Sequence, residues 1–178
     1  MQPSQRITRV SRRFRLLFTV LIITLPIGYG LFWLFFNELS EFPKYSPLDH
    51  LVTRELTASD RLLGFLVTMI PASVVLLCLL TLTRLFRLYE AHKFFTANNV
   101  KCFRRLGYLL FVWVLARLIY DPLIAIALTY HNAPGSRRVI LTLDSADLTA
   151  VIVGGLLLVI SWIMDEARKL QEDQAYTI

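Results

Sequence analysis

The stretch LLGFLVTMIPASVVLLCLLTLT, residues 62–83, contains no charged side chain. Crossing the hydrocarbon core of a bilayer, which is about 30 Å thick, takes about 20 predominantly apolar residues in an α-helix that rises 1.5 Å per residue. This stretch is long enough to do so. We therefore expect residues 62–83 to form a transmembrane helix.

Three further segments of the same kind lie on either side of it along the chain. Residues 16–36 and 148–164 are also uncharged, and residues 106–130 are apolar except for one arginine and one aspartate. The composition agrees, because 56% of the residues are hydrophobic and 18% are charged, whereas soluble domains are roughly 45–50% apolar. The sequence predicts an all-α integral membrane four-helix bundle that forms a single domain over residues 1–178.

A cleaved signal peptide is the alternative interpretation of residues 16–36, because a basic stretch precedes them. A signal peptide has an apolar core of about 7–15 residues and ends in small residues at the cleavage site. Residues 16–36 form a longer segment that closes on Phe35, Phe36 and Asn37. We expect a retained helix.

The distribution of lysine and arginine predicts the orientation, because short loops rich in these residues remain in the cytoplasm. They are concentrated before the first predicted helix, between the second and third, and after the fourth, at Arg6, Arg9, Arg12, Arg13, Arg15, Arg84, Arg87, Lys93, Lys101, Arg104, Arg105, Arg168 and Lys169. The other two loops hold fewer, at Lys44, Arg54, Arg61, Arg137 and Arg138. Both the N-terminus and the C-terminus are therefore predicted to be cytoplasmic.

The net charge of +6 follows from the same basic residues. In a soluble protein such a charge would suggest nucleic-acid binding. Next to transmembrane helices it is explained more simply by contact with anionic lipid headgroups, worth about 1 kcal/mol per basic residue. We expect the lipid bilayer as a partner and no direct contact with nucleic acid.

No motif for catalysis, a cofactor or a metal is present in the sequence. His50, His92 and His131 fall in three different loops without the spacing of metal ligands. Cys78 lies in a predicted helix and Cys102 in a cytoplasmic segment, where disulfides are rare. We expect no enzyme activity, no cofactor and no disulfide.

The segment between the second and third predicted helices, residues 83–107, interleaves apolar and charged residues at helical spacing. Both transmembrane helices are therefore expected to project into the cytoplasm, joined by a tight turn around residues 91–95. Thr96 is the expected N-cap of the helix that follows the turn.

Two other helix starts are predicted from short polar residues. Ser59 is the expected N-cap of the second transmembrane helix, with an acidic residue in its first turn, and either Asp144 or Ser145 is expected to cap the fourth. The conformation of residues 131–147, including the β-branched run at 139–143, is left open between a strand, a helical turn and a segment on the membrane surface.

Two separated motifs carry a family resemblance. RLFRLYEAHKFFTANNVKCFRRLGYLL, residues 84–110, resembles the central motif of a bacterial family of small membrane proteins called domain of unknown function 2975. LDSADLTAVIVGGLLLVISWIMDEARKLQEDQAYTI, residues 143–178, is similar to the end of that family. The family usually has a glycine near His92 and another near Ala167, and both are missing here. A histidine can adopt the positive φ that suits the turn, at some cost.

The resemblance implies a four-helix protein of the bacterial cytoplasmic membrane without established catalytic residues. Members often occur beside a small helix-turn-helix transcription regulator of the Cro/C1 type, which suggests that this regulator is a cytoplasmic partner. Residues 84–105 and 165–178 are the expected docking surface, with basic residues Arg84, Arg87, Lys93, Lys101, Arg104 and Arg105. Ordinary solvation of these charges is the alternative interpretation.

Arg117 and Asp121 are the two charges inside the third predicted helix. A central arginine or aspartate costs about 2.5–3.5 kcal/mol on insertion scales, so two isolated charges would cost roughly twice as much. Residues four apart share a helix face and can form a charge-assisted hydrogen bond. We therefore expect an intramembrane ion pair between Arg117 and Asp121.

Pro26, Pro71 and Pro122 lie inside predicted helices and mark expected kinks, because proline removes a helical hydrogen bond. Kinks and an ion pair would suit two alternative packings of one bundle. The leading hypothesis is therefore a regulatory or sensory membrane partner of a cytoplasmic transcription regulator. The alternatives are a structural or assembly subunit of a membrane complex, and a small transporter or channel that uses Arg117 and Asp121. Signal, ligand and oligomeric state are left open.

Overall fold

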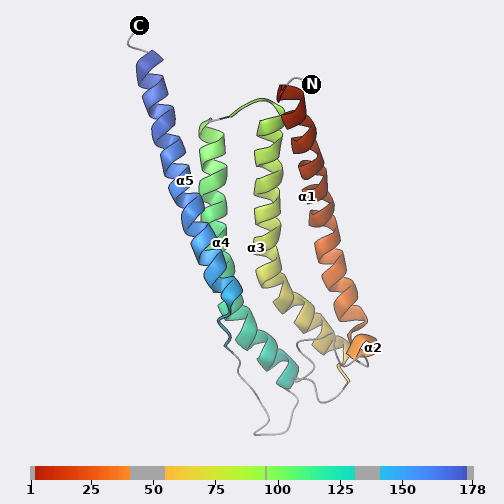
Figure 1. The fold of residues 1–178 in the computed structure, drawn as a ribbon. Helices are drawn as coiled ribbons and strands as arrows, with labels where there is room; N and C mark the ends of the chain where they lie inside the picture. The colour runs from red at the N-terminus through yellow and green to blue at the C-terminus, as the bar shows by residue number, and fades with distance from the viewer. Residues whose placement is uncertain (1–2, 41–54, 95, 131–140, 176–178) are drawn as a thin grey trace.

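The structure, a computed structural model, describes residues 3–40, 55–94, 96–130 and 141–175. These residues form helices α1 (Pro3–Leu34), α2 (Phe36–Ser40), α3 (Ala58–Glu90), α4 (Ala97–Thr129) and α5 (Ser145–Ala175) (Figure 1). The long helices α1, α3, α4 and α5 contain the segments predicted to cross the membrane, and all of them are long and apolar enough to do so. The predicted all-α class with four transmembrane helices is confirmed.

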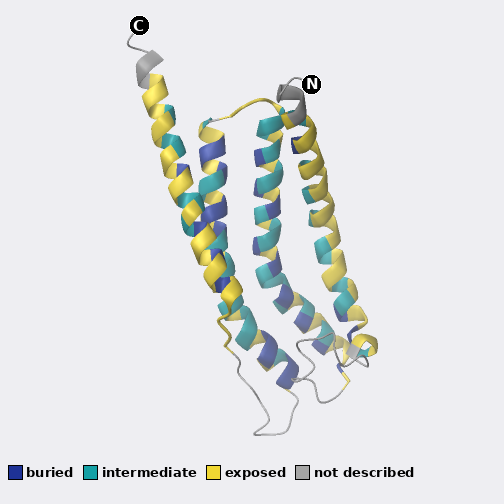
Figure 2. Cartoon of the chain, viewed as in Figure 1, coloured by how far each residue is buried: buried dark blue, intermediate teal, exposed yellow. Residues whose placement is uncertain are grey.

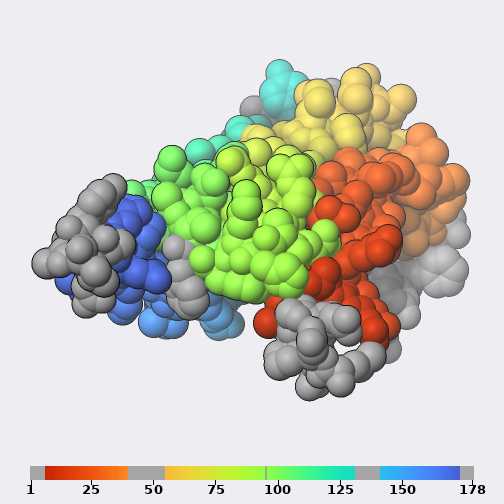
Figure 3. Space-filling model, turned by 90° about the horizontal axis from the view of Figure 1, so that it is seen from above, coloured from red at the N-terminus to blue at the C-terminus, as the bar shows by residue number. Residues whose placement is uncertain are grey.

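The four long helices lie side by side in the order α1, α3, α4, α5. Extensive contacts join α1 to α3, α3 to α4, and α4 to α5. Figure 3, seen from above, shows the same order across the molecule. The helices of the predicted bundle thus form an open row. A bilayer permits this arrangement because lipid tails are as apolar as the side chains of a protein core and can cover the remaining helix faces.

The start of α1 and the end of α5 lie at one end of the row, together with the turn between α3 and α4 (Figure 1). We call this the terminal end, and the opposite end, where α1 leads into α2 and α4 finishes, the loop end. This arrangement agrees with an even number of membrane crossings. The cytoplasmic orientation of the terminal end stays a prediction.

The largest buried cluster lies at the loop end. It consists of Trp33, Phe36, Leu56, Ile124, Ala125 and Leu128, from α1, α2, α4 and the segment before α3. A second cluster, Val74, Leu109 and Ala116, lies between α3 and α4. The outer faces of α1 and α5 are largely exposed (Figure 2), and many of the exposed side chains are large and apolar, as expected for helices that face lipid.

The start of α3 differs from the prediction by two residues. Its N-cap is Thr57, which has an extended backbone, and not Ser59. The Asp60 N–H donates to Thr57 Oγ1, and the Thr57 N–H donates to Asp60 Oδ2 at 3.1 Å. This reciprocal capping box requires an acidic side chain three residues after the cap. Thr57 meets that requirement, since Asp60 lies three positions further on.

The turn between α3 and α4 is tight, as predicted, and it places His92 at a φ of 56°. The His92 N–H donates to the Tyr89 carbonyl and the Lys93 N–H to the Leu88 carbonyl, at 3.1 and 3.0 Å. This pair of bonds is the Schellman motif, in which the residue after the C-cap adopts the left-handed conformation and is usually glycine. His92 therefore occupies the position that glycine usually takes in this motif.

Thr96 is the N-cap residue of α4, as predicted, but its side chain makes no capping hydrogen bond. Asn99, in the first turn of α4, closes the turn instead. Its side chain is completely buried and its Nδ2 donates to the Lys93 carbonyl at 2.7 Å. The turn is thus held by a side chain that follows it in the sequence.

Replacing His92 with glycine is expected to raise the stability by about 0.5–1 kcal/mol, because glycine adopts positive φ without the steric cost of a Cβ. The exposed contact of 3.4 Å between Thr8 Oγ1 and His92 Nε2 would be lost, with little effect at a solvated site. Thermal unfolding in detergent micelles measures the change. Ala91→Gly is the matched control, since Ala91 has a φ of −82° and should lose stability. A lower unfolding midpoint in both variants would contradict this account of the turn.

The three prolines predicted to mark kinks all lie inside continuous helices: Pro26 in α1, Pro71 in α3 and Pro122 in α4. Figure 1 shows α3 and α4 each changing direction part-way along their length. A proline inside a helix accounts for such a bend because its ring clashes with the preceding turn.

Candidate functional site

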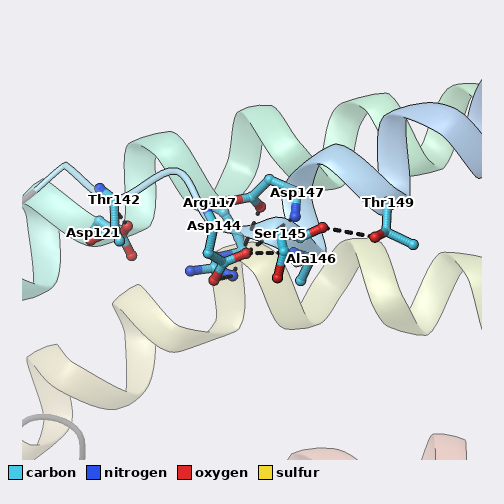
Figure 4. A network of polar contacts seen from close by, with 8 residues as sticks. All are labelled: Arg117, Asp121, Thr142, Asp144, Ser145, Ala146, Asp147 and Thr149. Atoms are coloured by element: carbon cyan, nitrogen blue, oxygen red, sulfur yellow. Dashed lines mark hydrogen bonds and ion pairs between the residues drawn. The ribbon is translucent and has the colours of Figure 1, made fainter.

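Arg117 of α4 lies beside the first turn of α5 (Figure 4). Its Nη1 donates to Asp144 Oδ2 at 3.0 Å and lies 3.8 Å from Asp147 Oδ1. The Arg117 guanidinium also lies 5.6 Å from the centre of the Trp113 ring, one turn earlier in α4, within the range of a cation–π interaction. The positive charge is therefore neutralised by two carboxylates from the start of α5.

Asp144 and Asp147 lie there because they begin the helix. Asp144 Oδ1 accepts from the backbone N–H groups of Ala146 and Asp147, at 2.9 and 3.2 Å. Asp147 Oδ2 accepts in return from the Asp144 N–H at 3.1 Å. This is a second capping box, and it confirms Asp144, of the two predicted residues, as the cap of α5.

Each carboxylate thus has one oxygen that serves the helix end and one that faces Arg117. The side chain of Asp147 is only 4% exposed, and its Oδ1 has no hydrogen-bond partner among the described residues. A buried carboxylate oxygen without a hydrogen bond is destabilising unless a positive charge lies nearby. Arg117 supplies that charge.

Asp144 lies outside the helix and is the accessible member of the group. The hydrogen bond from Arg117 lowers the pKa of its carboxyl below the ordinary value, and the backbone N–H groups of Asp147 and Ala146 act in the same direction. Asp144 is therefore ionised at neutral pH.

Asp121 has a different partner. Its Oδ2 accepts from the backbone N–H of Thr142 at 3.2 Å. Thr142 belongs to residues 141–144, which form neither helix nor strand, while residues 131–140 lie outside the described residues. Asp121 and Arg117, one turn apart on α4, therefore both hold the short segment that leads into α5.

The predicted direct ion pair between Arg117 and Asp121 is corrected by these contacts. The spacing of four residues does place both side chains toward one side of α4, but α5 begins beside that side. Its capping carboxylates and the N–H of Thr142 provide closer partners than the two residues provide for each other.

Arg117 lies near the middle of the apolar stretch 106–130 of α4 but beside the start of the apolar stretch of α5. Residues 148–164 of α5, which are predicted to cross the membrane, begin directly after Asp147. At 1.5 Å per residue they span about 25 Å. The group formed by Arg117, Asp144 and Asp147 therefore lies where α5 enters its apolar stretch.

Two further contacts join α4 to α5. A Cβ added at Gly107 would lie 2.9 Å from the Gly154 carbonyl, and one added at Gly154 would lie 3.1 Å from the Gly107 carbonyl. The two backbones meet closely because neither residue has a side chain. Towards the terminal end, Arg104 Nη2 lies 3.7 Å from Asp165 Oδ2. α4 and α5 are thus held at both ends and packed tightly between.

The six basic residues predicted to form a docking surface do not act as one group. Arg84 from α3 and Lys101 and Arg105 from α4 line a single cavity between these helices. Arg104 is turned towards α5, where it contacts Asp165. The two others, Arg87 and Lys93, are exposed near the turn.

The other predicted docking segment comprises residues 165–178, of which residues 165–175 continue α5 past the ends of its neighbours at the terminal end (Figure 1). Arg168 pairs with Glu172 at 2.6 Å and with Asp165 at 3.3 Å, and Lys169 lies 3.5 Å from Glu166. These pairs along one helix favour its helical state. The residues after Ala175 lie outside the described residues.

The sequence model of the family described as "Protein of unknown function (DUF2975)" matches residues 33–178. The chain belongs to this family. No curated protein and no solved structure matches the chain. Membership of the DUF2975 family agrees with the four long apolar helices and describes the chain as a multi-pass membrane protein.

Two site residues of this DUF2975 protein, Asp144 and Asp147, were not predicted from the sequence to be partners of Arg117. A signal for them exists, because Asp144-Ser-Ala-Asp147 repeats the pattern of Thr57-Ala-Ser-Asp60, a cap followed by an acid three residues later. The pattern identifies a helix start. It does not identify which residue of another helix lies beside that start.

Proposed function

We propose that the protein is a regulatory membrane protein of the bacterial cytoplasmic membrane. In this proposal both termini are cytoplasmic, and a change at the loop end alters the binding of a cytoplasmic helix-turn-helix regulator at the terminal end. The role is one of binding and not of catalysis. The contact of Arg117 with the capping carboxylates of α5 is the observation that carries the proposal.

That contact supports a coupling role because it joins a loop to a long helix. Residues 141–144 connect the loop end to α5, and they are held to α4 through Asp144 and through the N–H of Thr142. Movement of the loop would change these two contacts first. A polar contact in a largely apolar setting has two discrete states, formed and broken, which is what a switch requires.

The packing of α4 on α5 supports transmission along the molecule. Close contact at Gly107 and Gly154 leaves little room for the helices to bend independently. A displacement of the start of α5 would therefore reach Asp165 and the projecting end of the helix. The contact between Arg104 and Asp165 would report that displacement at the terminal end.

The projecting end of α5 is the surface proposed to bind the regulator. Glu166, Lys169 and Glu172 are exposed there, beside the exposed apolar side chain of Leu170. An apolar residue surrounded by charges of both signs resembles a small protein interface, in which the rim sets specificity.

Cross-linking in intact membranes tests the proposal. A photoreactive amino acid at position 170 of the full chain is expected to cross-link to a helix-turn-helix regulator of the Cro/C1 type. The combined exchange Glu166→Lys and Lys169→Glu, which keeps the net charge, is expected to lower the yield at least several-fold. Arg13→Gln on the exposed face of α1 is the control and should leave the yield unchanged.

The second arm of the experiment tests coupling. Asp144→Asn lies at the start of α5, far from the projecting end, and is expected to change the cross-linking yield at position 170 although it removes no surface contact there. Equal yields from the charge exchange, the control and the unaltered protein would contradict docking. An effect of the charge exchange without any effect of Asp144→Asn would contradict transmission through α5.

A further inference from the structure

Three basic side chains surround one cavity between α3 and α4 without any acidic residue in its lining. The cavity has a volume of about 330 Å³ and is lined by Leu80, Thr81, Arg84, Lys101, Cys102 and Arg105. Small-molecule sites usually have volumes of roughly 300–1,000 Å³. The cavity is large enough for a small anionic group.

The charges of these three residues are not balanced within the described part of the chain. No described acidic group lies within ion-pair distance of Arg84, Lys101 or Arg105, whereas the neighbouring Arg104 and Arg15 contact Asp165 and Glu90. Three like charges around one cavity repel each other. An anion in the cavity would remove that repulsion.

The cavity lies at the level along the helices at which a lipid headgroup is expected. Arg84 directly follows the uncharged stretch 62–83 of α3, and Arg105 directly precedes the apolar stretch of α4 that begins at Leu106. The basic residues therefore lie where both helices leave the hydrocarbon core. Basic pockets between transmembrane helices at this level bind the headgroups of anionic lipids.

A second hollow continues from the cavity into the membrane. It has a volume of about 300 Å³ and shares Lys101 and Arg105 with the cavity. Its lining continues along α4 with Arg104, Tyr108, Leu109 and Val112. A basic end that leads into an apolar groove matches the shape of a phospholipid, with its phosphate at one end and an acyl chain at the other.

We propose that this cavity binds the phosphate headgroup of one anionic phospholipid, with an acyl chain of the same molecule in the groove along α4. Arg84 and Arg105 donate to the phosphate oxygens from opposite helices, and Lys101 adds a third positive charge. The bound lipid thereby joins α3 to α4 at the terminal end. This site is independent of the protein docking proposed for α5.

Another basic hollow provides the contrast. Arg9, Arg12 and Arg13 adjoin apolar residues on the surface of α1, but all of them come from one helix. These arginines attract anionic lipid as any basic surface does. They do not enclose a cavity between two helices. Substitution of these three residues changes the net charge by the same amount as substitution of the three cavity residues.

Lipid binding to the purified full chain tests the proposal. The protein in a neutral detergent is titrated with phosphatidylglycerol and, separately, with phosphatidylcholine, and bound lipid is counted by native mass spectrometry. One retained phosphatidylglycerol is expected. Combined Arg84→Gln, Lys101→Gln and Arg105→Gln should weaken its binding by at least about tenfold. Combined Arg9→Gln, Arg12→Gln and Arg13→Gln should weaken it by less than about threefold.

Two further arms separate the alternatives. The conservative variant Arg84→Lys with Arg105→Lys keeps the charge and should retain most of the binding, which guards against a general loss of folding. Inorganic phosphate in excess should not displace the lipid, because it lacks the acyl chain. Equal losses in the two triple glutamine variants, equal binding of phosphatidylcholine, or displacement by inorganic phosphate would each overturn the proposal.

Discussion

Replacing Arg117 with leucine is expected to destabilise the protein by about 2–3 kcal/mol and to lower its accumulation in the membrane. Removal of one partner from a buried ion pair leaves the other charge without compensation, at a cost of about 3–5 kcal/mol. The side chain of Arg117 is 23% exposed, so the loss should fall below that range. Most of it arises at Asp147, whose Oδ1 is buried without a hydrogen bond.

A pair of double-mutant cycles identifies the partner of Arg117. Asp147→Asn keeps an oxygen for the Asp144 N–H and removes the charge. The cycle of Arg117→Leu with Asp147→Asn should therefore show a coupling free energy of about 1–2 kcal/mol, because the second change relieves the unpaired carboxylate. The cycle with Asp121→Asn should show less than about 0.5 kcal/mol, since Asp121 accepts from Thr142.

Unfolding of the purified protein by denaturant in micelles measures each corner of the two cycles. Stronger coupling of Arg117 to Asp121 than to Asp147 would restore the direct pair predicted from the sequence and refute the structural arrangement. Asp121→Asn alone should have a small effect, because an asparagine oxygen can still accept from the Thr142 N–H.

Gly64→Ala is expected to cause a second large loss, by forcing α1 away from α3. A Cβ added at Gly64 would overlap the ring of Trp33, which is 2% exposed. Trp33 cannot move freely, because its Nε1 donates to Thr68 Oγ1 at 3.0 Å and its ring stacks on Phe36. Overpacking of a buried site costs about 1–3 kcal/mol, and the lost hydrogen bond of Trp33 adds to that cost.

Gly28→Ala is the matched control for Gly64→Ala. Both changes replace glycine with alanine inside an apolar helix, Gly28 in α1 and Gly64 in α3, and these two helices pack against each other. A Cβ at Gly28, however, would meet nothing within 4 Å. Alanine favours helix over glycine, so the control should be neutral or slightly stabilising. Thermal unfolding in detergent micelles measures the difference. Equal stability of the two alanine variants would show that Trp33 and Gly64 do not form the close contact described.

The helices could be predicted from the sequence because their cause is local. An uncharged run of sufficient length must satisfy its backbone hydrogen bonds internally in lipid, and a helix does this within one segment. The turn at His92 and the cap at Thr96 were predictable for the same reason, since both depend on residues a few positions apart. Ser59 was the local exception, because Thr57 also meets the capping rule and Asp60 decides between them.

The partner of Arg117 could not be predicted in this way. Local spacing favours Asp121, which is one turn away, whereas Asp144 lies on another segment beyond a loop. Choosing between them requires knowing that α5 begins beside Arg117, which depends on how α5 packs on α4. The same holds for Arg84, which lies on α3, and for Lys101 and Arg105, which lie on α4. They line one cavity only because α3 and α4 lie side by side.

By itself, the sequence determined that this chain forms four long apolar helices of the kind that cross a membrane, because hydrophobicity and length act within each segment. The tertiary structure alone decided which helices lie side by side, which carboxylates neutralise Arg117 and which basic residues enclose a cavity. The physical reason is that ion pairs and cavities depend on distances between segments that are far apart in the chain, and those distances are set by packing.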